Sequence, residues 1–460
     1  MAIATRNPAT GVTVEEFEEH SGEQVEARLA AAAAAFSRYR LTSFAERATM
    51  MTRAAGILDA EAGALGELVT TEMGKTVREA RAEVAKCSTA CRYFAHHSEA
   101  FLAAEPTDPA GVGAVAAYAF YQPIGVVLAV MPWNFPMWQA LRFAVPALMA
   151  GNVGLLKHAS NVPRTALYIE DLFRRAGFAE GTFQTLLVGS EQVGRILRDD
   201  RVAAATLTGS NQAGEAVASV AGSVTKATVL ELGGSDPFVV MASADLRRAA
   251  RVGARARCQN NGQSCIAAKR FVVQRDVAGE FTSMFLAEMQ ALRVGDPLDD
   301  GTDVGPLATE AGRSGVEELV ADAVDHGAEV LCGGRRLPGP GWWYPPTVIR
   351  GVTPAMRIYR EEVFGPVAAL FTVADADEAI RLANATPFGL GSSYWTGDES
   401  EKRRFIRDSA AGLVFVNGMT ASYPQLPFGG VKQSGYGREL SAHGIRAFCN
   451  LKTVWVGSDL

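Results

Sequence analysis

The sequence predicts an α/β protein with two parallel-sheet domains. Its 460 residues are too many for one ordinary core, so two or three domains are expected. Short apolar or β-branched runs alternate with helical segments from residue 113 to residue 232, and a second alternating set follows Cys265. This alternation is typical of parallel sheets whose faces are covered by helices, and ligands bind beyond the carboxyl ends of such strands.

The elements follow in order along the chain. Residues 26–103 have the periodic, Ala-rich pattern of helices. The strands expected in the first alternating set are Gly125–Met131, Asn152–Lys157, Thr182–Val188, Ala203–Thr208 and Thr228–Leu232. Those expected in the second set are Arg270–Gln274, Trp342–Ile349, Val367–Phe371, Gly389–Tyr394 and Gly412–Asn417.

Two segments fit neither set. Gly113–Tyr121 alternates like an exposed hairpin strand, and Lys452–Val456 is a β-rich run near the carboxyl terminus. Exposed strands of this kind usually pair, so we expect them to contact another subunit. The acidic stretch Glu15–Glu19 is most simply a solvated face.

The composition excludes several classes of function. Hydrophobic residues make up 48% of the chain and charged residues 20%, which is a globular composition. The net charge of −6 disfavours binding to nucleic acid or to an anionic membrane. The amino terminus lacks an apolar signal region, and the apolar run from Ile124 to Met131 is too short to span a bilayer. Six scattered cysteines do not resemble a disulfide framework, so we expect a cytoplasmic protein with reduced thiols.

Cys265 and Glu231 are the most informative pair of residues. Cys265 follows the polar turn Gln259–Ser264, and Glu231 precedes Leu-Gly-Gly. A thiol on a turn suits an exposed nucleophile, and an acid beside two glycines suits a nearby base. A lone cysteine is more often a packing residue, and a glutamate is more often on the surface. The order and spacing of the two favour thiol chemistry.

Six motifs occur in one order along the chain. They are Pro132-Trp133-Asn134-Phe135-Pro136, Thr208-Gly209-Ser210, Glu231-Leu232-Gly233-Gly234, Asn261-Gly262-Gln263-Ser264-Cys265, Glu361-Glu362-Val363-Phe364-Gly365-Pro366 and Pro427-Phe428-Gly429-Gly430. With them the chain resembles the aldehyde dehydrogenase family over essentially its whole length. No single motif is specific, but six in family order are.

The resemblance implies a covalent mechanism. Cys265 is the expected nucleophile, and the side-chain amide of Asn134 and the backbone N–H of Cys265 are the expected donors to the developing alkoxide. Glu231 is the expected base for hydrolysis of the thioester, and its presence separates the chain from relatives that pass the acyl group to coenzyme A. Without the other motifs, a cap at a helix start would be as good an interpretation of Asn134 as a catalytic donor.

A nicotinamide dinucleotide is the implied cofactor, although the chain has no Gly-x-Gly-x-x-Gly after a strand. Gly209 and Ser210 enter a helix whose amino terminus can hold pyrophosphate. The resemblance implies further contacts with the dinucleotide from Trp133, Lys157, Ser160, Leu232, Glu362 and Phe364. Many relatives that prefer NAD carry Glu where Ser160 stands, and that carboxylate would repel a 2′-phosphate. Ser160 beside Lys157 therefore favours NADP, with NAD possible.

The predicted substrate contacts lie on the helix that begins at Pro136. Trp138 and Arg142 are four residues apart and share a helix face, and Ser422 precedes the last motif. This combination resembles the bacterial branch of the family that oxidises succinic semialdehyde, with Arg142 as a clamp for the carboxylate. The alternative for Arg142 is an internal salt bridge.

We therefore expect oxidation of succinic semialdehyde to succinate with NADP. The alternatives are a dehydrogenase for another short aldehyde, such as glutaric semialdehyde or an aliphatic one, and a non-catalytic oligomeric scaffold. The resemblance implies a homodimer or homotetramer. It also implies two Rossmann-type domains. The expected dinucleotide-binding domain comprises residues 1–112 and 122–230, and residues 428–445 return to it. The expected catalytic domain comprises residues 231–427. The expected oligomerisation strands are residues 113–121 and 446–460.

No metal site is expected. Cys87, Cys91, His96 and His97 cluster, but their spacing does not fit the usual zinc sites, and packing within a helix is the simpler interpretation. A protective disulfide between Cys258 and Cys265 is a second, less favoured hypothesis.

Overall fold

The computed structural model describes residues 2–457. Its first part is built on a six-stranded sheet in the order β17-β9-β8-β5-β6-β7, parallel except for β17. The strands are β5 Val126–Met131, β6 Val153–His158, β7 Phe183–Thr185, β8 Val202–Thr208, β9 Ala227–Glu231 and β17 Gly435–Tyr436. The helices are α1 Gly22–Tyr39, α2 Phe44–Ala60, α3 Ala62–Met73, α4 Val77–Phe101, α5 Pro136–Ala150, α6 Pro163–Ala176, α7 Val193–Arg198, α8 Asn211–Ser223 and α15 Ser441–Arg446.

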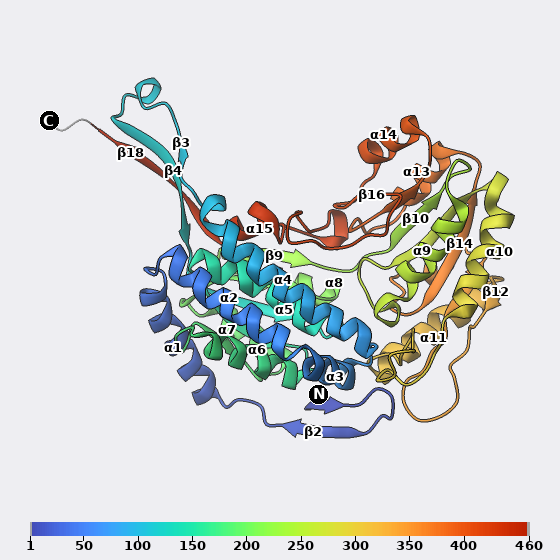
Figure 1. The fold of residues 1–460 in the computed structure, drawn as a ribbon, viewed down its shortest axis with the longest axis horizontal. Helices are drawn as coiled ribbons and strands as arrows, with labels where there is room; N and C mark the ends of the chain where they lie inside the picture. Colours follow the sequence, from blue (N-terminus) through green and yellow to red (C-terminus); the bar gives the residue numbers. More distant parts are fainter. Residues whose placement is uncertain (1, 458–460) are drawn as a thin grey trace.

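The second part is built on a seven-stranded sheet in the order β12-β13-β14-β11-β10-β15-β16, with only β12 antiparallel to its neighbour. Figure 1 shows it on the side of the molecule opposite the arm. Its strands are β10 Asp236–Val240, β11 Ala268–Gln274, β12 Glu329–Cys332, β13 Thr347–Arg350, β14 Val367–Val373, β15 Ser393–Trp395 and β16 Phe415–Val416. Its helices are α9 Leu246–Cys258, α10 Arg275–Ala291, α11 Glu310–Asp325, α12 Arg357–Arg360, α13 Ala376–Asn384 and α14 Glu399–Asp408.

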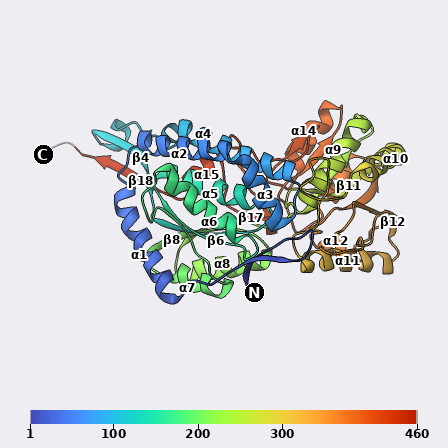
Figure 2. The same ribbon diagram turned by 60° about the horizontal axis from the view of Figure 1, so that its bottom comes forward.

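A three-stranded arm projects from the first part in both views (Figures 1 and 2). It consists of β3 (Glu105–Pro106), β4 (Ala116–Pro123) and β18 (Cys449–Val456), in the order β18-β4-β3. The two segments that the sequence left without a sheet therefore pair with each other. On the arm, the side chains of Leu451 and Trp455 are more than half exposed. The predicted oligomerisation segment 446–460 extends past the described residues.

The amino-terminal hairpin pairs β1 (Ile3–Arg6) with β2 (Thr13–Phe17). The acidic stretch predicted as a solvated face is thus partly a strand, although its glutamates are exposed as expected.

The sequence analysis missed β10, because its Asp-Pro start and short Phe-Val-Val run gave no strand pattern. All five of its residues are buried, as in a central strand covered on both faces.

Helix α5 positions much of the site because it is buried on every side. All fifteen of its residues are buried, and it begins directly after Asn134 and Phe135 with Pro136 at its first turn. It packs between β6 and α4. An internal helix with this packing has few alternative positions, so its first turns are a rigid platform.

Among residues 2–457, no helix has the length and apolar character needed to cross a membrane.

Candidate active site

The turn before Cys265 has an unusual backbone. After α9 ends, Asn260, Asn261 and Gly262 have φ of 58°, 56° and 76°. Asparagine tolerates this left-handed region better than other non-glycine residues. At Gly262 a Cβ atom would lie 2.5 Å from backbone atoms of Gly365 and Pro366, so only glycine fits. The Asn-Asn-Gly motif therefore forms the turn that carries Cys265, the predicted nucleophile.

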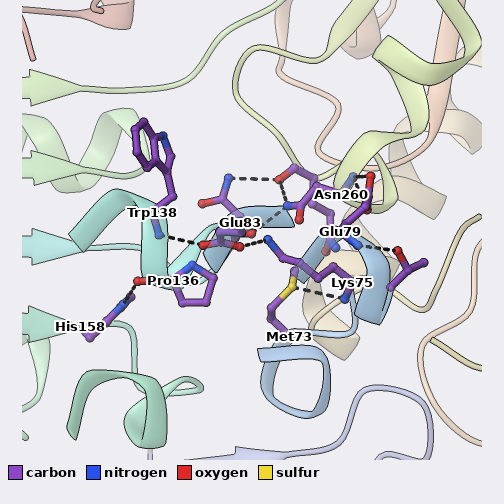
Figure 3. A network of polar contacts seen from close by, with 11 residues as sticks. Met73, Lys75, Glu79, Glu83, Pro136, Trp138, His158 and Asn260 are labelled. Carbon is purple, nitrogen blue, oxygen red and sulfur yellow. Dashed lines mark hydrogen bonds and ion pairs between the residues drawn. The ribbon is translucent and has the colours of Figure 1, made fainter. Parts of the chain in front are cut away.

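Contacts from distant elements hold this turn. The carboxylate of Glu79 on α4 accepts the backbone N–H of Asn260 at 3.0 Å (Figure 3). The side chain of Asn261 donates to the carbonyls of Gly74 and Pro306 and accepts from Gly305 N, each at 2.8 Å. Burial raises the pKa of Glu79, while its hydrogen bond to Asn260 lowers it. The turn is thus fixed by the distant side chain of Glu79 and by the contacts of its own Asn261 side chain with the backbone of other segments.

Lys269 is a site residue that the sequence reasoning missed. Its ammonium donates to the carbonyls of Ser264 and Cys265 at 2.9 and 2.8 Å, and it forms an ion pair with Glu362 at 2.9 Å. It therefore joins the nucleophile turn to the Glu-Glu-Val-Phe motif. The only sequence signal was its place four residues after Cys265 at the start of β11.

The environment of Cys265 favours the neutral thiol in the free protein. Its side chain is half-buried, and burial raises its pKa to about 12, although Arg142 and Lys269 act in the opposite direction. Gly234 packs against it, because a Cβ atom there would lie 2.5 Å from the Cys265 carbonyl oxygen. The thiol therefore needs a proton acceptor or a bound cation to become a nucleophile.

Asn134, the predicted donor to the substrate oxygen, lies against the turn that carries Cys265. Its Nδ2 donates to Gln263 O at 3.1 Å, and its own carbonyl accepts from Asn260 Nδ2 at 2.8 Å. The start of α5 is fixed from the other side by His158, whose Nε2 lies 2.9 Å from Pro136 O (Figure 3). Burial lowers the pKa of His158 to about 4, so the ring is neutral and donates from Nε2.

Glu231 ends β9 and is fully enclosed. Within residues 2–457, both carboxylate oxygens lack a hydrogen-bond partner, and a Cβ atom at Gly429 would lie 2.7 Å from Oε1. Burial, followed by repulsion from Glu439, raises the pKa of Glu231 well above its ordinary value. Glu439 was also missed by the sequence reasoning. It is held by backbone hydrogen bonds of 2.8 Å to Phe428 and forms an ion pair with Arg142.

One cavity of about 290 Å³ brings together most of the predicted residues. It is lined by Pro132, Trp133, Asn134, Gln139, Thr208, Gly209, Ser210, Leu232, Gly233, Cys265, Glu362 and Phe364. Residues predicted for the nucleophile, the oxyanion and the dinucleotide thus share one space. Glu231 adjoins it through Leu232.

The cavity suits a dinucleotide. Gly209 and Ser210 stand where the thirteen-residue α8 opens on it, and Ser210 Oγ caps the helix through Ala213 N. Free N–H groups and the helix dipole at this end favour pyrophosphate. The rings of Trp133 and Phe364 meet edge to face at 5.6 Å, and the side chain of Glu362 is held by Lys269. These residues would hold the dinucleotide.

Lys157 and Ser160 lie outside the lining of that cavity, at and beyond the end of β6. Burial lowers the pKa of Lys157, and the nearby carboxylates of Glu191 and Glu19 raise it. The backbone carbonyl of Ser160 accepts from Ala4 N at 3.0 Å, which fixes the loop after β6. Their roles in binding the adenosine ribose and 2′-phosphate stay a prediction.

The predicted substrate residues divide into two groups. Trp138 and Ser422 meet, with the indole Nε1 donating to Ser422 Oγ at 3.0 Å. Arg142 is buried instead against Glu439, 3.3 Å from Thr208 Oγ1 and 4.5 Å from the centroid of the Phe428 ring. This is the internal salt bridge given as the alternative to a carboxylate clamp.

The remaining cysteines do not join the site. Cys87 and Cys91 are buried in α4, and Cys258 is buried against the sulfur of Met289 at 3.8 Å. All six cysteines are free thiols. The part of the chain that the structure describes, residues 2–457, contains no group of three or more His, Cys, Asp or Glu side chains suited to a metal ion.

The chain belongs to the aldehyde dehydrogenase family, because residues 1–454 match the model of that family. It is 62% identical over 456 residues to succinate-semialdehyde dehydrogenase [NADP(+)] 1 of Mycobacterium tuberculosis, covering 99% of this chain and 100% of the relative. It is 61% identical over 460 residues to succinate-semialdehyde dehydrogenase [NADP(+)] of Mycobacterium avium, covering 100% of this chain and 98% of the relative. The fold is similar to that of succinic semialdehyde dehydrogenase from Streptococcus pyogenes in complex with NADP+, with a TM-score of 0.96, 34% identity and coverage of 99% and 100%.

Proposed function

We propose that the protein oxidises succinic semialdehyde to succinate with NADP as the hydride acceptor. The observation that carries the proposal is the end-to-end identity of 62% to an enzyme named for this substrate and cofactor. The shared cavity of Cys265, Asn134 and the α8 terminus supports it, since covalent aldehyde chemistry needs these three features together.

Cys265 forms the covalent bond. The thiol loses its proton to solvent, its sulfur adds to the aldehyde carbon, and the C=O π bond opens. The negative charge that develops on oxygen is stabilised by Asn134 Nδ2 and by the backbone N–H of Cys265. One N–H of Asn134 is already used on Gln263 O, so the second remains for the substrate. When bound, NADP accepts the hydride that leaves the former aldehyde carbon.

Glu231 acts after the thioester has formed. Its unpartnered oxygens can take a proton from water as that water attacks the acyl carbon and the C–S bond breaks. Burial and then repulsion from Glu439 raise the pKa of Glu231, and Arg142 lowers it. The arrangement therefore tunes a buried acid toward the range that general base catalysis requires. Glu231 then passes the proton to the departing sulfur, so that the products are succinate and the restored thiol.

Initial rates test the substrate and the cofactor together. Formation of reduced dinucleotide is measured with succinic semialdehyde, glutaric semialdehyde and propanal, each with NADP and with NAD. We expect the highest kcat/KM with succinic semialdehyde and NADP. Activity only with propanal would keep the dehydrogenase and overturn the substrate, and no activity with any aldehyde would favour the scaffold.

The cofactor preference has its own test in Ser160→Glu. The added carboxylate repels a 2′-phosphate and can bond a ribose 2′-hydroxyl. We expect the variant to lose roughly 10-fold or more in kcat/KM for NADP while activity with NAD is kept or improved. An unchanged ratio of the two would remove Ser160 from the proposed 2′-phosphate contacts.

We further propose that the arm joins subunits in a homodimer or homotetramer. Its exposed apolar side chains need cover, and in the described part of the chain β18 is an unpaired sheet edge. Light scattering coupled to size exclusion gives the subunit number, and a monomer at micromolar concentration would contradict the proposal. A cytoplasmic location fits the reduced cysteines and stays part of this proposal.

A further inference from the structure

Lys269 connects two parts of the site through one ammonium group. It lies near the start of β11, and only 2% of its side chain is exposed. The ammonium donates to the carbonyls of Ser264 and Cys265 and forms an ion pair with Glu362 Oε1, all within 2.9 Å. Lys269 does not line the cavity of 290 Å³, whereas Cys265 and Glu362 do. It can therefore influence a bound ligand only through these partners.

The Glu362 carboxylate is confined at both of its oxygens. Oε1 faces Lys269, which is the one ion-pair partner of Glu362 among residues 2–457. Oε2 lies against Gly233, where an added Cβ atom would be only 2.6 Å away. A carboxylate has more acceptor positions than one ammonium group uses. Glu362 therefore presents a fixed acceptor to the cavity, suited to ligand hydroxyl groups.

The positive charge of Lys269 also acts on the thiol of Cys265. The charged groups near this thiol come from four segments: Arg142 on α5, Lys269 on β11, Asp236 on β10 and Glu362 in the loop between α12 and β14. Burial is the largest influence and raises the pKa of the thiol, the two cations lower it, and the two carboxyl groups raise it. Burial also raises the pKa of Asp236 to about 7, and Lys269 lowers it. Without Lys269, one cation would face two acids beside the thiol.

We propose that Lys269 is a positioning residue that links dinucleotide binding to the nucleophile. Its ammonium orients the Glu362 carboxylate toward the ribose hydroxyls of the dinucleotide. The same group holds the carbonyl of Cys265 and keeps a positive charge beside the sulfur. Loss of Lys269 therefore disturbs both functions, although it contacts neither the dinucleotide nor the aldehyde. The inference rests on the proposed function, because Glu362 has this role only if a dinucleotide binds.

The test uses two measurements that do not depend on turnover. Iodoacetamide labelling of the Cys265 peptide, without dinucleotide, is followed by mass spectrometry between about pH 6 and pH 9. Titration calorimetry gives the Kd of NADP. We expect Lys269→Met to slow labelling roughly 10-fold across this pH range, because the thiolate is the reactive form. We also expect it to weaken NADP binding roughly 10-fold, because the Glu362 carboxylate is no longer held.

Lys226→Met is the matched control. The Lys226 ammonium also donates to two backbone carbonyls, those of Leu197 and Asp199, at 2.8 and 2.6 Å. Lys226 directly precedes β9, so it lies at the opposite end of this strand from Glu231. We expect its labelling profile and its Kd for NADP to stay within about twofold of the wild type.

Glu362→Gln separates a positioning role of Lys269 from general damage to the fold. The amide removes a negative charge near the thiol, so we expect faster labelling of Cys265 together with weaker NADP binding. The two variants thus change NADP binding in the same direction and labelling in opposite directions. In the double variant, the losses in NADP binding should be clearly less than additive, because Lys269 acts through Glu362.

Three results would overturn the assignment. They are an unchanged labelling rate or an unchanged Kd in Lys269→Met, slower labelling in Glu362→Gln, and additive losses of NADP affinity in the double variant. Failure of the proposed function is seen separately, because the wild-type protein would then bind neither NADP nor NAD.

Discussion

The two ends of the site are built differently. At the reacting end, the side chains of Glu79 and Lys269 bond backbone groups of the turn of Cys265, and the turn's own Asn261 side chain bonds the Gly74 carbonyl. At the entrance, the contacts join side-chain tips of Lys86, Trp138 and Ser422 from separate elements. Under the proposed function, the reacting end would hold one geometry for every aldehyde, whereas the entrance would select among them. Substitutions at the two ends should therefore have different substrate dependence.

The largest effect is expected from Glu231→Gln, which removes the base without removing the nucleophile. Acylation of Cys265 should continue, so one equivalent of reduced dinucleotide per active subunit should form in a burst. Steady-state turnover should then fall by roughly a thousandfold, since general base catalysis contributes factors of this order. Stopped-flow absorbance with succinic semialdehyde and with butanal measures both phases.

A similar loss for both aldehydes places Glu231 at the reacting end. A variant that shows neither burst nor turnover, while still folded by circular dichroism, would instead assign Glu231 to formation of the thioester. Another base would then have to activate the water that attacks the thioester.

Gly429→Ala tests how tightly the reacting end is packed. The new Cβ atom would lie 2.7 Å from Glu231 Oε1 and 2.9 Å from the carbonyl oxygen of Gly437, at a φ of 155°. We expect roughly a 10- to 100-fold fall in kcat with either aldehyde, because small displacements of a catalytic group are costly. Gly418→Ala is the control, since nothing lies within 4 Å of its added methyl group. Equal kinetics of the two variants would show that the carboxylate of Glu231 tolerates displacement.

The same contrast explains what could be predicted from the sequence. The motif residues Asn134, Gly209, Cys265 and Phe364 line one cavity. They could be predicted because each stands in a short motif that indicates its chemistry or its backbone conformation. Lys86, Lys269 and Glu439 act through partners far away in sequence, and a single lysine or glutamate carries no pattern. The alternation of strands and helices revealed both sheets, but β10 was missed, because a buried central strand after Asp-Pro shows no alternation.

Glu79→Gln should weaken the reacting end from outside the cavity. The neutral amide loses a charge-assisted hydrogen bond to Asn260 N, which holds the left-handed turn (Figure 3). We expect a loss of about 1–2 kcal/mol in the free energy of unfolding. We also expect a fall in kcat by about tenfold, equal for both aldehydes. Urea denaturation and steady-state kinetics measure the two effects. A rise in KM for succinic semialdehyde alone would place Glu79 with the entrance instead.

The smallest effect concerns His158, which fixes the start of α5 beneath both ends of the site. Its pKa is lowered from 6.5 to about 4 by burial, so protonation favours the unfolded chain, and stability is lost as the pH falls below 6.5. Between pH 7 and pH 5 this group alone should cost about 2 kcal/mol. His158→Gln can still donate to Pro136 O but does not titrate. Urea denaturation at both pH values should therefore show a smaller acid loss in the variant, since the contributions of all other groups cancel in the difference. Parallel losses in the two proteins would mean that the ring is not held neutral in the folded state.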